Sequence, residues 1–421
     1  MKELLRKIKK KYGKAQKKYG MWVLPGAVCY VLNRGMIVLL KKCIKRVKNK
    51  QLIFETKPDF SDNGRALHEY MIENHYNEKY KIIWLVEDPK KFAKYQVKNV
   101  KFVRSINSRY LWRTVSAYYY SLTSKYVFFT HNFKWVKEKT KDQIYINLWH
   151  GCGYKSSRRP EGAENANVFD YCLVPGTLFK KSKAKFFDCT EDQVLPIGYP
   201  RYDLYKRDNQ NVDRYLNSLS EEKCKNIIWM PTFIQSTDLI YYKNPIPNII
   251  GLAFLNSIND LQKLEDVCAE YHVNLIIKSH RIGRTVGQGG KDLKKNHIFF
   301  LDNDDLEKMD IQLYELLNKT DALITDYSSA AVDYLLLDKP IAFVLESFDD
   351  YAKTRGVIFP NTKDYMPGSH IYTFEELKKF IEEVSCGIDS TSEKRAEVLP
   401  IMQNRSESYS KQVLDYFHIV L

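Results

Sequence analysis

Several polar residues in this 421-residue sequence stand at the ends of hydrophobic runs, where they could take part in chemistry. The first is His150, which follows the alternating run QIYINLW and precedes a turn that contains Gly151 and Gly153. Alternating apolar residues predict a strand, and the two glycines give the next residues backbone freedom. The spacing therefore predicts a titratable imidazole at a strand end, beside a backbone that can approach a ligand closely.

Polar residues recur at other predicted strand ends. His280 closes the run VNLIIKSH, and Ser328 and Ser329 stand between the run DALITD and the helical pattern AAVDYLLL. Hydroxyl groups and backbone N–H groups at a helix start favour an anion. Arg201 lies on the turn IGYPRYD, and its planar guanidinium is suited to bind a phosphate with two parallel hydrogen bonds. Together these residue types predict an anion-binding site at the strand ends.

Each of these residues also has a simpler interpretation on its own. A histidine at a strand end is more often a hydrogen-bonded structural residue, and two serines before a helix are more often an N-cap. Arg201 could be half of a surface salt bridge, which contributes little to stability. The acidic run DNDD (302–305) mimics a set of metal ligands, but its position between a strand and a helix favours a solvated loop. We therefore expect neither a metal ion nor a cofactor.

The elements that must position these residues follow an alternation of short apolar runs and helical patterns. This alternation is typical of α/β proteins with parallel sheets. Two such halves are separated by a polar stretch near 206–222, which predicts domains at 51–210 and 211–421, with a helical end at 374–421. The predicted strands are 51–56, 80–86, 125–130, 143–149, 169–176, 226–231, 273–280, 297–302, 321–329 and 339–345.

The formal net charge of +15 is confined to the first fifty residues. Residues 1–50 hold sixteen basic residues and one acidic residue, so the remaining fifty basic and fifty acidic residues cancel. Apolar residues recur there at three- and four-residue steps, which predicts basic amphipathic helices at an anionic membrane surface. Pro25, Asn33 and Arg34 interrupt the apolar stretch between them, so an interfacial segment is favoured over a spanning helix. A solvated basic tail, with or without RNA, is the alternative.

Redox state and nucleic-acid binding can also be addressed from composition. The eight cysteines include no CxxC pair, which predicts reduced thiols in a cytosolic setting. Outside residues 1–50 the chain is neutral and has no aromatic RNA-binding motif, which argues against a nucleic-acid partner.

The order of the motifs is more specific than any one of them. LWHGCGYK, GYPRYD, MPTF, IKSH, DALITDYSSAAVDYLLLDKPIAFV and RGVIF, in this order over roughly residues 125–375, resemble the CDP-glycerol glycerophosphotransferase family. That family includes the wall teichoic acid primases and polymerases, with capsule relatives. The resemblance implies a GT-B-like fold, in which two Rossmann-like parallel-sheet domains face a cleft. It also implies a peripheral enzyme on the cytoplasmic face of the cell membrane.

The resemblance also implies roles for individual residues. His150 and His280 would be catalytic, with His150 as the general base that takes the proton of an acceptor hydroxyl. Cys152 stands where the family usually has threonine. The implied donor-binding residues are Gly151, Cys152, Gly153, Lys155, Arg201, Pro231, Thr232, Lys278, Ser279, Ser328, Ser329 and Asp333.

The expected reaction is transfer of a polyol phosphate, with release of CMP. The donor would be CDP-glycerol or CDP-ribitol, and the acceptor a lipid-linked glycan or a growing polyol-phosphate polymer. Two alternatives remain open at this point. One is a GT-B glycosyltransferase that uses a nucleotide sugar and releases UDP, and the other is an RNA-binding protein that uses the basic leader.

Overall fold

The computed structural model describes most of the chain after the basic leader. Of the two predicted amphipathic helices, the first, over 5–19, lies outside the described residues, and the second, over 37–47, is described only in part. Within the described ranges, no helix combines the length and the apolar character that crossing a membrane requires. The described residues are 35, 39–40, 42–44, 46–105, 111–131, 133, 139–156, 169–231, 252–255, 257–278, 296–346, 348–354 and 356–421.

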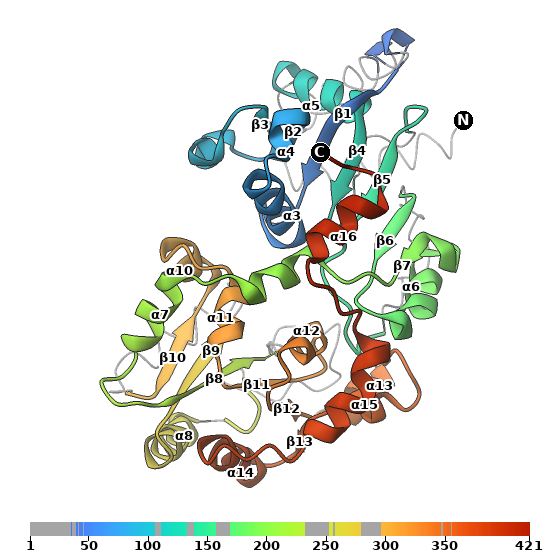
Figure 1. The fold of residues 1–421 in the computed structure, drawn as a ribbon. Coiled ribbons are helices and arrows are strands. Elements are labelled where there is room, and N and C mark those ends of the chain that lie inside the picture. The colour runs from blue at the N-terminus through green and yellow to red at the C-terminus, as the bar shows by residue number, and fades with distance from the viewer. Residues whose placement is uncertain are drawn as a thin grey trace, which may run out of the picture. The chain divides into compact units, whose positions relative to one another are not determined.

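The chain divides into two compact units, which are described separately below (Figure 1). The first comprises Met1–His150, Ala166–Cys172 and His418–Leu421. The second comprises Gly151–Asn165 and Leu173–Phe417. The division falls at the peptide bond between His150 and Gly151, so the strand-end histidine and the glycine turn belong to different units.

The first sheet is parallel in all of its recorded strand pairs. Its strands form because short runs such as KIIWLV are apolar on both faces, as a sheet covered on both sides requires. Helix α5 packs against β1 and β3, and α4 against β2. In sheet order the described strands are β3 (Val100–Arg104), β2 (Lys81–Val86), β1 (Lys48–Glu55), β4 (Ser124–Phe129), β5 (Ile144–Asn147), β6 (Tyr171–Leu173) and β7 (Val194–Leu195). The helical segments that follow β1 to β3 are α3 (Asp62–Glu73), α4 (Tyr76–Lys79), η2 (Pro89–Tyr95) and α5 (Leu111–Thr123).

The second sheet is also parallel in its recorded pairs. Its apolar core lies between the sheet and helices α8 and α14, where Leu264, Ile277 and Phe380 are buried. In sheet order the described strands are β10 (Ile298–Leu301), β9 (Val273–Lys278), β8 (Lys225–Met230), β11 (Ala322–Thr325), β12 (Ile341–Val344) and β13 (Ser369–Ile371).

The helical segments of the second unit connect these strands and follow the last of them. The α-helices are α6 (Lys180–Phe187), α7 (Gln210–Asn217), α8 (Ile258–Glu270), α10 (Asn303–Lys308), α11 (Leu313–Lys319), α12 (Ser329–Tyr334), α13 (Phe348–Thr354), α14 (Phe374–Ser385), α15 (Ser392–Met402) and α16 (Tyr409–Tyr416). The 3-10 helices are η3 (Thr177–Phe179), η4 (Glu191–Gln193), η5 (Pro200–Lys206), η7 (Leu335–Leu337) and η8 (Thr362–Tyr365).

Each sheet has a point where the strand order reverses. In the first sheet β1 lies beside both β2 and β4, and in the second β8 lies beside both β9 and β11. Ligands of open parallel sheets bind at the carboxyl ends of the strands next to such a reversal. A ligand site is therefore expected at the segments that follow β4 and β11.

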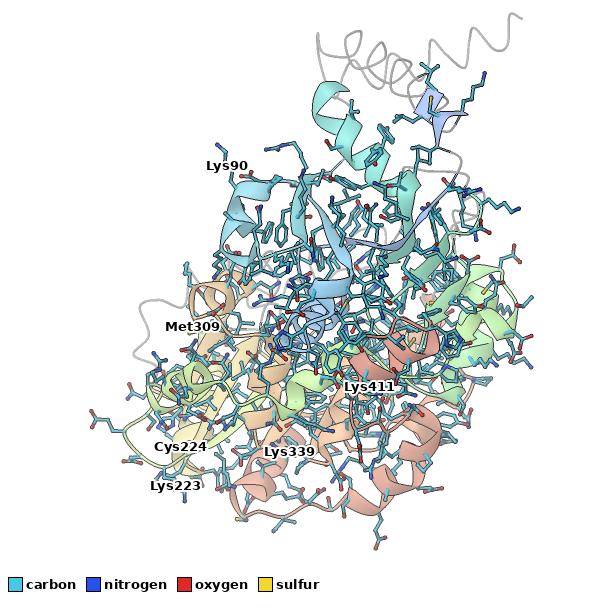
Figure 2. All side chains as sticks on the ribbon, turned by 45° about the horizontal axis from the view of Figure 1, so that its top comes forward. Lys90, Lys223, Cys224, Met309, Lys339 and Lys411 are labelled. Carbon is cyan, nitrogen blue, oxygen red and sulfur yellow. The ribbon has the colours of Figure 1, made fainter. Side chains whose placement is uncertain are left out.

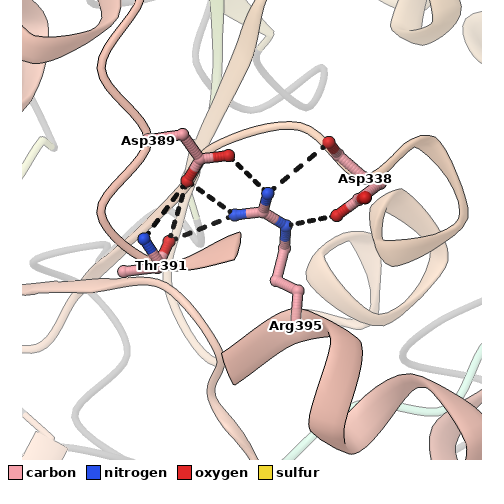
Figure 3. Close-up of polar contacts among 4 residues, drawn as sticks. All are labelled: Asp338, Asp389, Thr391 and Arg395. Atoms are coloured by element: carbon pink, nitrogen blue, oxygen red, sulfur yellow. Dashed lines mark hydrogen bonds and ion pairs between the residues drawn. The ribbon is translucent and has the colours of Figure 1, made fainter. Parts of the chain in front are cut away.

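Two polar networks fix the connections around β11 and β12. Lys339, labelled in Figure 2, donates to the carbonyl oxygens of Asn318 (2.6 Å) and Thr320 (2.7 Å), at the end of α11. Arg395 of α15 is almost fully buried, and its guanidinium binds Asp338, Asp389 and Thr391 (Figure 3). Because Asp338 directly follows η7, this network ties α15 to the end of the segment that begins with α12.

The predicted α/β class with two parallel sheets is confirmed, and so is the helical character of 374–421. Each predicted strand overlaps an observed one. Three strands were missed, namely β3, β7 and β13. The strand β7 has two residues and β13 has three, too few to show a period, and β3 exposes Lys101 in a run of five. The solvated loop expected at 302–305 was wrong, because Asp302 is the N-cap of α10 and accepts from the backbone N–H of Asp305 at 2.9 Å.

Candidate functional site

The glycine turn after β5 lies against the start of α12. A Cβ atom added to Gly153 would stand 2.7 Å from the backbone nitrogen of Ser329. One added to Gly151, whose φ is +138°, would stand 2.7 Å from the Ser329 Oγ. The glycines are thus needed for the packing of this turn on α12. This adds a second reason for them beside the predicted approach to a phosphate.

The start of α12 presents hydroxyl and backbone donors beside this turn. Ser328 occupies the N-cap position in an extended conformation, and its side chain makes no cap hydrogen bond. The simple N-cap interpretation is therefore not what the structure shows. Both serines are partly exposed, and the residues that follow them in α12 are buried. The helix start is thus anchored in the core, while its first polar groups remain accessible.

Arg201 lies in the same part of the second unit and is held on several sides. Its Nη2 atom lies 2.6 Å from Asp333 Oδ2, and both side chains are buried. Its guanidinium carbon lies 4.9 Å from the ring centroid of Tyr199 and 4.8 Å from that of Tyr314. A Cβ atom on Gly151 would come within 3.4 Å of Nη2, which places the guanidinium beside the glycine turn.

Asp333 is saturated by protein donors. Besides Arg201, it accepts a hydrogen bond from the Tyr314 hydroxyl at 2.6 Å and another from the Tyr202 hydroxyl. Burial and the nearby carboxylate raise the pKa of Tyr202 well above its usual value, so this phenol stays a proton donor. The carboxylate of Asp333 therefore acts on the position of Arg201. Tyr202 and Tyr314 were not singled out by sequence, since their link to Asp333 spans 131 and 19 residues.

The rest of the glycine turn is joined to the RGVIF motif. Lys155 forms an antiparallel bridge with Val357, and the Tyr154 carbonyl accepts from the N–H of Ile358 at 2.9 Å. The Lys155 ammonium lies 5.2 Å from the ring centroid of Tyr327, the residue before Ser328. One further motif of the family pattern, RGVIF, is thus joined to the glycine turn that packs on α12.

Cys152 and Lys278 point to protein partners. The thiol of Cys152 is buried and lies 3.3 Å from the Tyr199 hydroxyl, and burial raises its pKa. Lys278 donates to Asn303 Oδ1 at 2.5 Å, and burial lowers its pKa to about 8. Pro231 follows β8 and is partly exposed, whereas Thr232, Ser279 and His280 lie outside the described residues. Among the described residues, no group of three or more His, Cys, Asp or Glu is placed to hold a metal ion.

His150 lies in the first unit, at the end of β5, and its side chain is exposed. Its Nδ1 atom lies 3.3 Å from the carbonyl oxygen of Thr130, which can only accept a hydrogen bond. The neutral ring therefore carries its proton on Nδ1, and Nε2 is the nitrogen that can accept one. Asn63 donates to the carbonyls of Leu148 and Trp149 and fixes the backbone before the histidine.

Comparison with known families settles the relationship that the motif order suggested. A model of the family described as CDP-Glycerol:Poly(glycerophosphate) glycerophosphotransferase matches residues 37–414. This chain belongs to that family. The match includes every candidate site residue from His150 to Asp333, so the resemblance found in the sequence is confirmed.

Individual relatives agree with this membership. Teichoic acid poly(glycerol phosphate) polymerase of Bacillus spizizenii is 25% identical over 386 residues, which are 83% of this chain and 89% of that protein. Teichoic acid ribitol-phosphate primase of the same organism is 27% identical over 252 residues, 56% of this chain and 59% of that protein. The solved structure of the wall teichoic acid polymerase TagF covers 94% of this chain and 96% of its own, with a TM-score of 0.70 and 22% identity. This likeness confirms the predicted GT-B-like fold class.

Proposed function

We propose that this protein transfers a polyol phosphate from a CDP-activated donor to a hydroxyl group of a lipid-linked glycan or a growing polymer, releasing CMP. Glycerol phosphate is the first candidate for the transferred group, and the product would belong to a teichoic acid or a capsule. The observation that carries the proposal is the packing of the Gly151–Gly153 turn on Ser328 and Ser329, which joins two family motifs about 175 positions apart in the chain.

The charges and donors of the second unit suit a diphosphate. The start of α12 supplies the Ser328 and Ser329 hydroxyls and backbone N–H groups, and Arg201 and Lys155 supply positive charge beside them. Such preorganised donors stabilise charge that develops on a transferring phosphoryl group. Pro231, Thr232, Lys278 and Ser279 stay proposed as donor-binding residues, with Cys152 contributing through its backbone.

The proton of the attacking hydroxyl requires a base, and His150 is proposed for this role. The oxygen of the acceptor forms a bond to the donor phosphorus that carries the polyol, and the bond from that phosphorus to the CMP oxygen breaks. The hydroxyl proton goes to Nε2 of His150, because Nδ1 is engaged by the Thr130 carbonyl. General base catalysis contributes about 10²- to 10⁴-fold. His280 is proposed to offset charge on the phosphates.

The donor is tested by incubating the purified chain with CDP-glycerol and, separately, with CDP-ribitol, together with a lipid-linked acceptor. We expect CMP and a mass increase of the acceptor by one or more polyol phosphate units. The same assay identifies the polyol and the number of units added. Transfer of a sugar with release of UDP, and no release of CMP, would instead establish the glycosyltransferase alternative.

The base is tested with His150→Asn, which keeps a polar side chain of similar size without a titratable nitrogen. We expect turnover to fall by at least about 100-fold, with donor affinity retained. His272→Asn is the matched control, since His272 is exposed and asparagine tolerates its positive φ. Near-normal turnover of His150→Asn would remove His150 from the mechanism.

The basic leader is proposed to hold the enzyme on the cytoplasmic face of the cell membrane. Each Lys or Arg near an anionic surface contributes roughly 1 kcal/mol of attraction. Removal of residues 1–44, which leaves β1 intact, should abolish sedimentation with vesicles that contain anionic lipid and leave CMP release from a soluble acceptor unchanged. Equal sedimentation of the two chains, or binding that is indifferent to salt, would overturn this proposal.

A further inference from the structure

A second histidine packs on His150 in the first unit. The rings of His131 and His150 have centroids 4.3 Å apart and are inclined by only 12°, so they are stacked face to face. The Trp149 ring lies beside the same imidazole, with its centroid 4.0 Å away. His131 follows β4 and His150 follows β5, and these strands pair in parallel, so their carboxyl ends bring the two rings together.

Thr130 contacts both rings through hydrogen bonds. Its hydroxyl oxygen accepts from the backbone N–H of Lys57 at 3.3 Å and lies 3.1 Å from Nδ1 of His131. The carbonyl oxygen of the same threonine accepts a hydrogen bond from Nδ1 of His150 at 3.3 Å.

The stacked geometry excludes a direct proton relay. The N–H bonds and lone pairs of an imidazole lie in the plane of its ring, so two nearly parallel rings cannot hydrogen-bond to one another through their faces. A role for His131 must therefore act through packing and charge. Two like charges at this separation repel strongly enough to move a titration by about one pH unit or more. The stack thus favours states with at most one positive ring.

We propose that His131 is a positioning residue for His150, whose ring it holds face to face at the ends of β4 and β5. This inference rests on the proposed function, because it assumes that His150 accepts the acceptor's proton. A neutral His131 ring fixes the direction of Nε2 and presents a π face to the imidazolium that forms during transfer. His131 then assists the transfer by positioning His150, which remains the only proposed proton acceptor.

The surroundings of His131 agree with a neutral ring. Burial lowers its pKa, and the charge of Lys57 acts in the same direction, whereas the charge of Asp62 at the start of α3 raises it. Burial has the largest effect. The lowered pKa favours the neutral form of the His131 ring.

Three substitutions separate packing from charge. His131→Ala removes the ring and should lower kcat about 10-fold with little change in the donor KM. His131→Phe restores a flat neutral ring and should bring kcat back to within about threefold of the original. His131→Lys places a permanent charge beside His150 and should move the acid limb of the pH–rate profile down by about one pH unit. His370→Ala, at another half-buried histidine in the second unit, is the control.

A measurement without substrate distinguishes failure of this inference from failure of the proposed function. Histidine-labelled protein is titrated by NMR, with the His150 signal assigned from the His150→Asn variant. We expect its midpoint to fall by about one pH unit in His131→Lys and to stay unchanged in His370→Ala. An unchanged His150 midpoint in His131→Lys would overturn the inference. Equal kcat losses in His131→Ala and His131→Phe would overturn it as well. A normal NMR result with no CMP release would overturn the proposed function alone.

Discussion

At the scale of single residues, the buried carboxylate of Asp333 holds the Arg201 side chain in place in the second unit. Asp333 receives hydrogen bonds from Arg201, Tyr202 and Tyr314, while the rings of Tyr199 and Tyr314 flank the guanidinium. Burying an ion pair requires such extra donors, because the desolvation of both charges is otherwise not offset. The arginine is thereby fixed before any anion arrives, which reduces the ordering needed on binding.

This arrangement predicts unequal effects of two substitutions. Asp333→Asn leaves Arg201 with an uncompensated buried charge and should lower the free energy of unfolding by about 3–5 kcal/mol and weaken donor binding. Tyr314→Phe removes one hydrogen bond and should lower the same free energy by only about 1–2 kcal/mol. Urea unfolding and calorimetric titration with CDP-glycerol measure both effects. Equal effects of the two substitutions would show that the carboxylate charge is not what holds Arg201.

At the scale of elements, the site depends on a turn that packs on a short helix. The Gly151–Gly153 turn and α12 approach so closely that backbone atoms of Ser328 and Ser329 occupy the space of a side chain. The buried residues Ala331 and Val332 hold α12 against the sheet, so the helix start cannot retreat. Any atom added to the turn must therefore displace one of the two elements.

Gly153→Ala tests this packing. The new methyl carbon would stand 2.7 Å from the Ser329 nitrogen, a distance that forces the turn away from α12. We expect donor affinity to fall at least about 10-fold, since a misplacement of 1 Å can reduce activity 10²-fold. Gly35→Ala is the control, because an added Cβ there meets nothing within 4 Å. Unchanged donor binding in Gly153→Ala would show that the turn adapts without loss.

The sequence predicted most elements because their apolar runs are buried on both faces. KIIWLV and VNLIIK are examples, and the polar residues at their ends mark the sheet edge. Partners that meet only through tertiary packing could not be predicted. His131 is the clearest case, since it ends a strand that the sequence did reveal but becomes notable only once β4 is known to pair with β5. A systematic search of every predicted strand end for titratable residues would have found it.

At the scale of the whole molecule, a buried histidine couples the stability of the first unit to pH. His68 of α3 is buried, and its Nδ1 accepts a hydrogen bond from the Trp84 indole at 3.1 Å. Burial lowers its pKa to about 4, and of the smaller effects the charge of Glu69 raises it and that of Arg65 lowers it. The unfolded chain, with a histidine pKa near 6.5, binds the proton more readily than the folded unit does.

Acidification below pH 6.5 lowers the stability of the first unit through His68. Above pH 6.5 both states are neutral at His68, and as the pH falls from 6.5 to about 4 the unfolded state gains the proton first, so stability is lost. The loss amounts to about 3 kcal/mol. Hydrogen exchange of the β2 amides at pH 7 and pH 4.5 should show it, and His68→Gln, which keeps an acceptor for Trp84, should reduce it. An identical pH dependence in the variant would assign the effect to other groups.

Residues His418–Leu421, which follow the second unit in the chain, belong to the first unit, and this has a consequence for synthesis. Ile419 is fully buried, and the carbonyl of Val420 accepts a hydrogen bond from the Tyr80 hydroxyl, 340 positions earlier. Strands β1 to β5 leave the ribosome long before these residues do. The first sheet therefore remains incompletely covered until the entire second unit has been translated. A truncation before His418 would leave it in that state permanently, a defect that chaperones and proteases would detect.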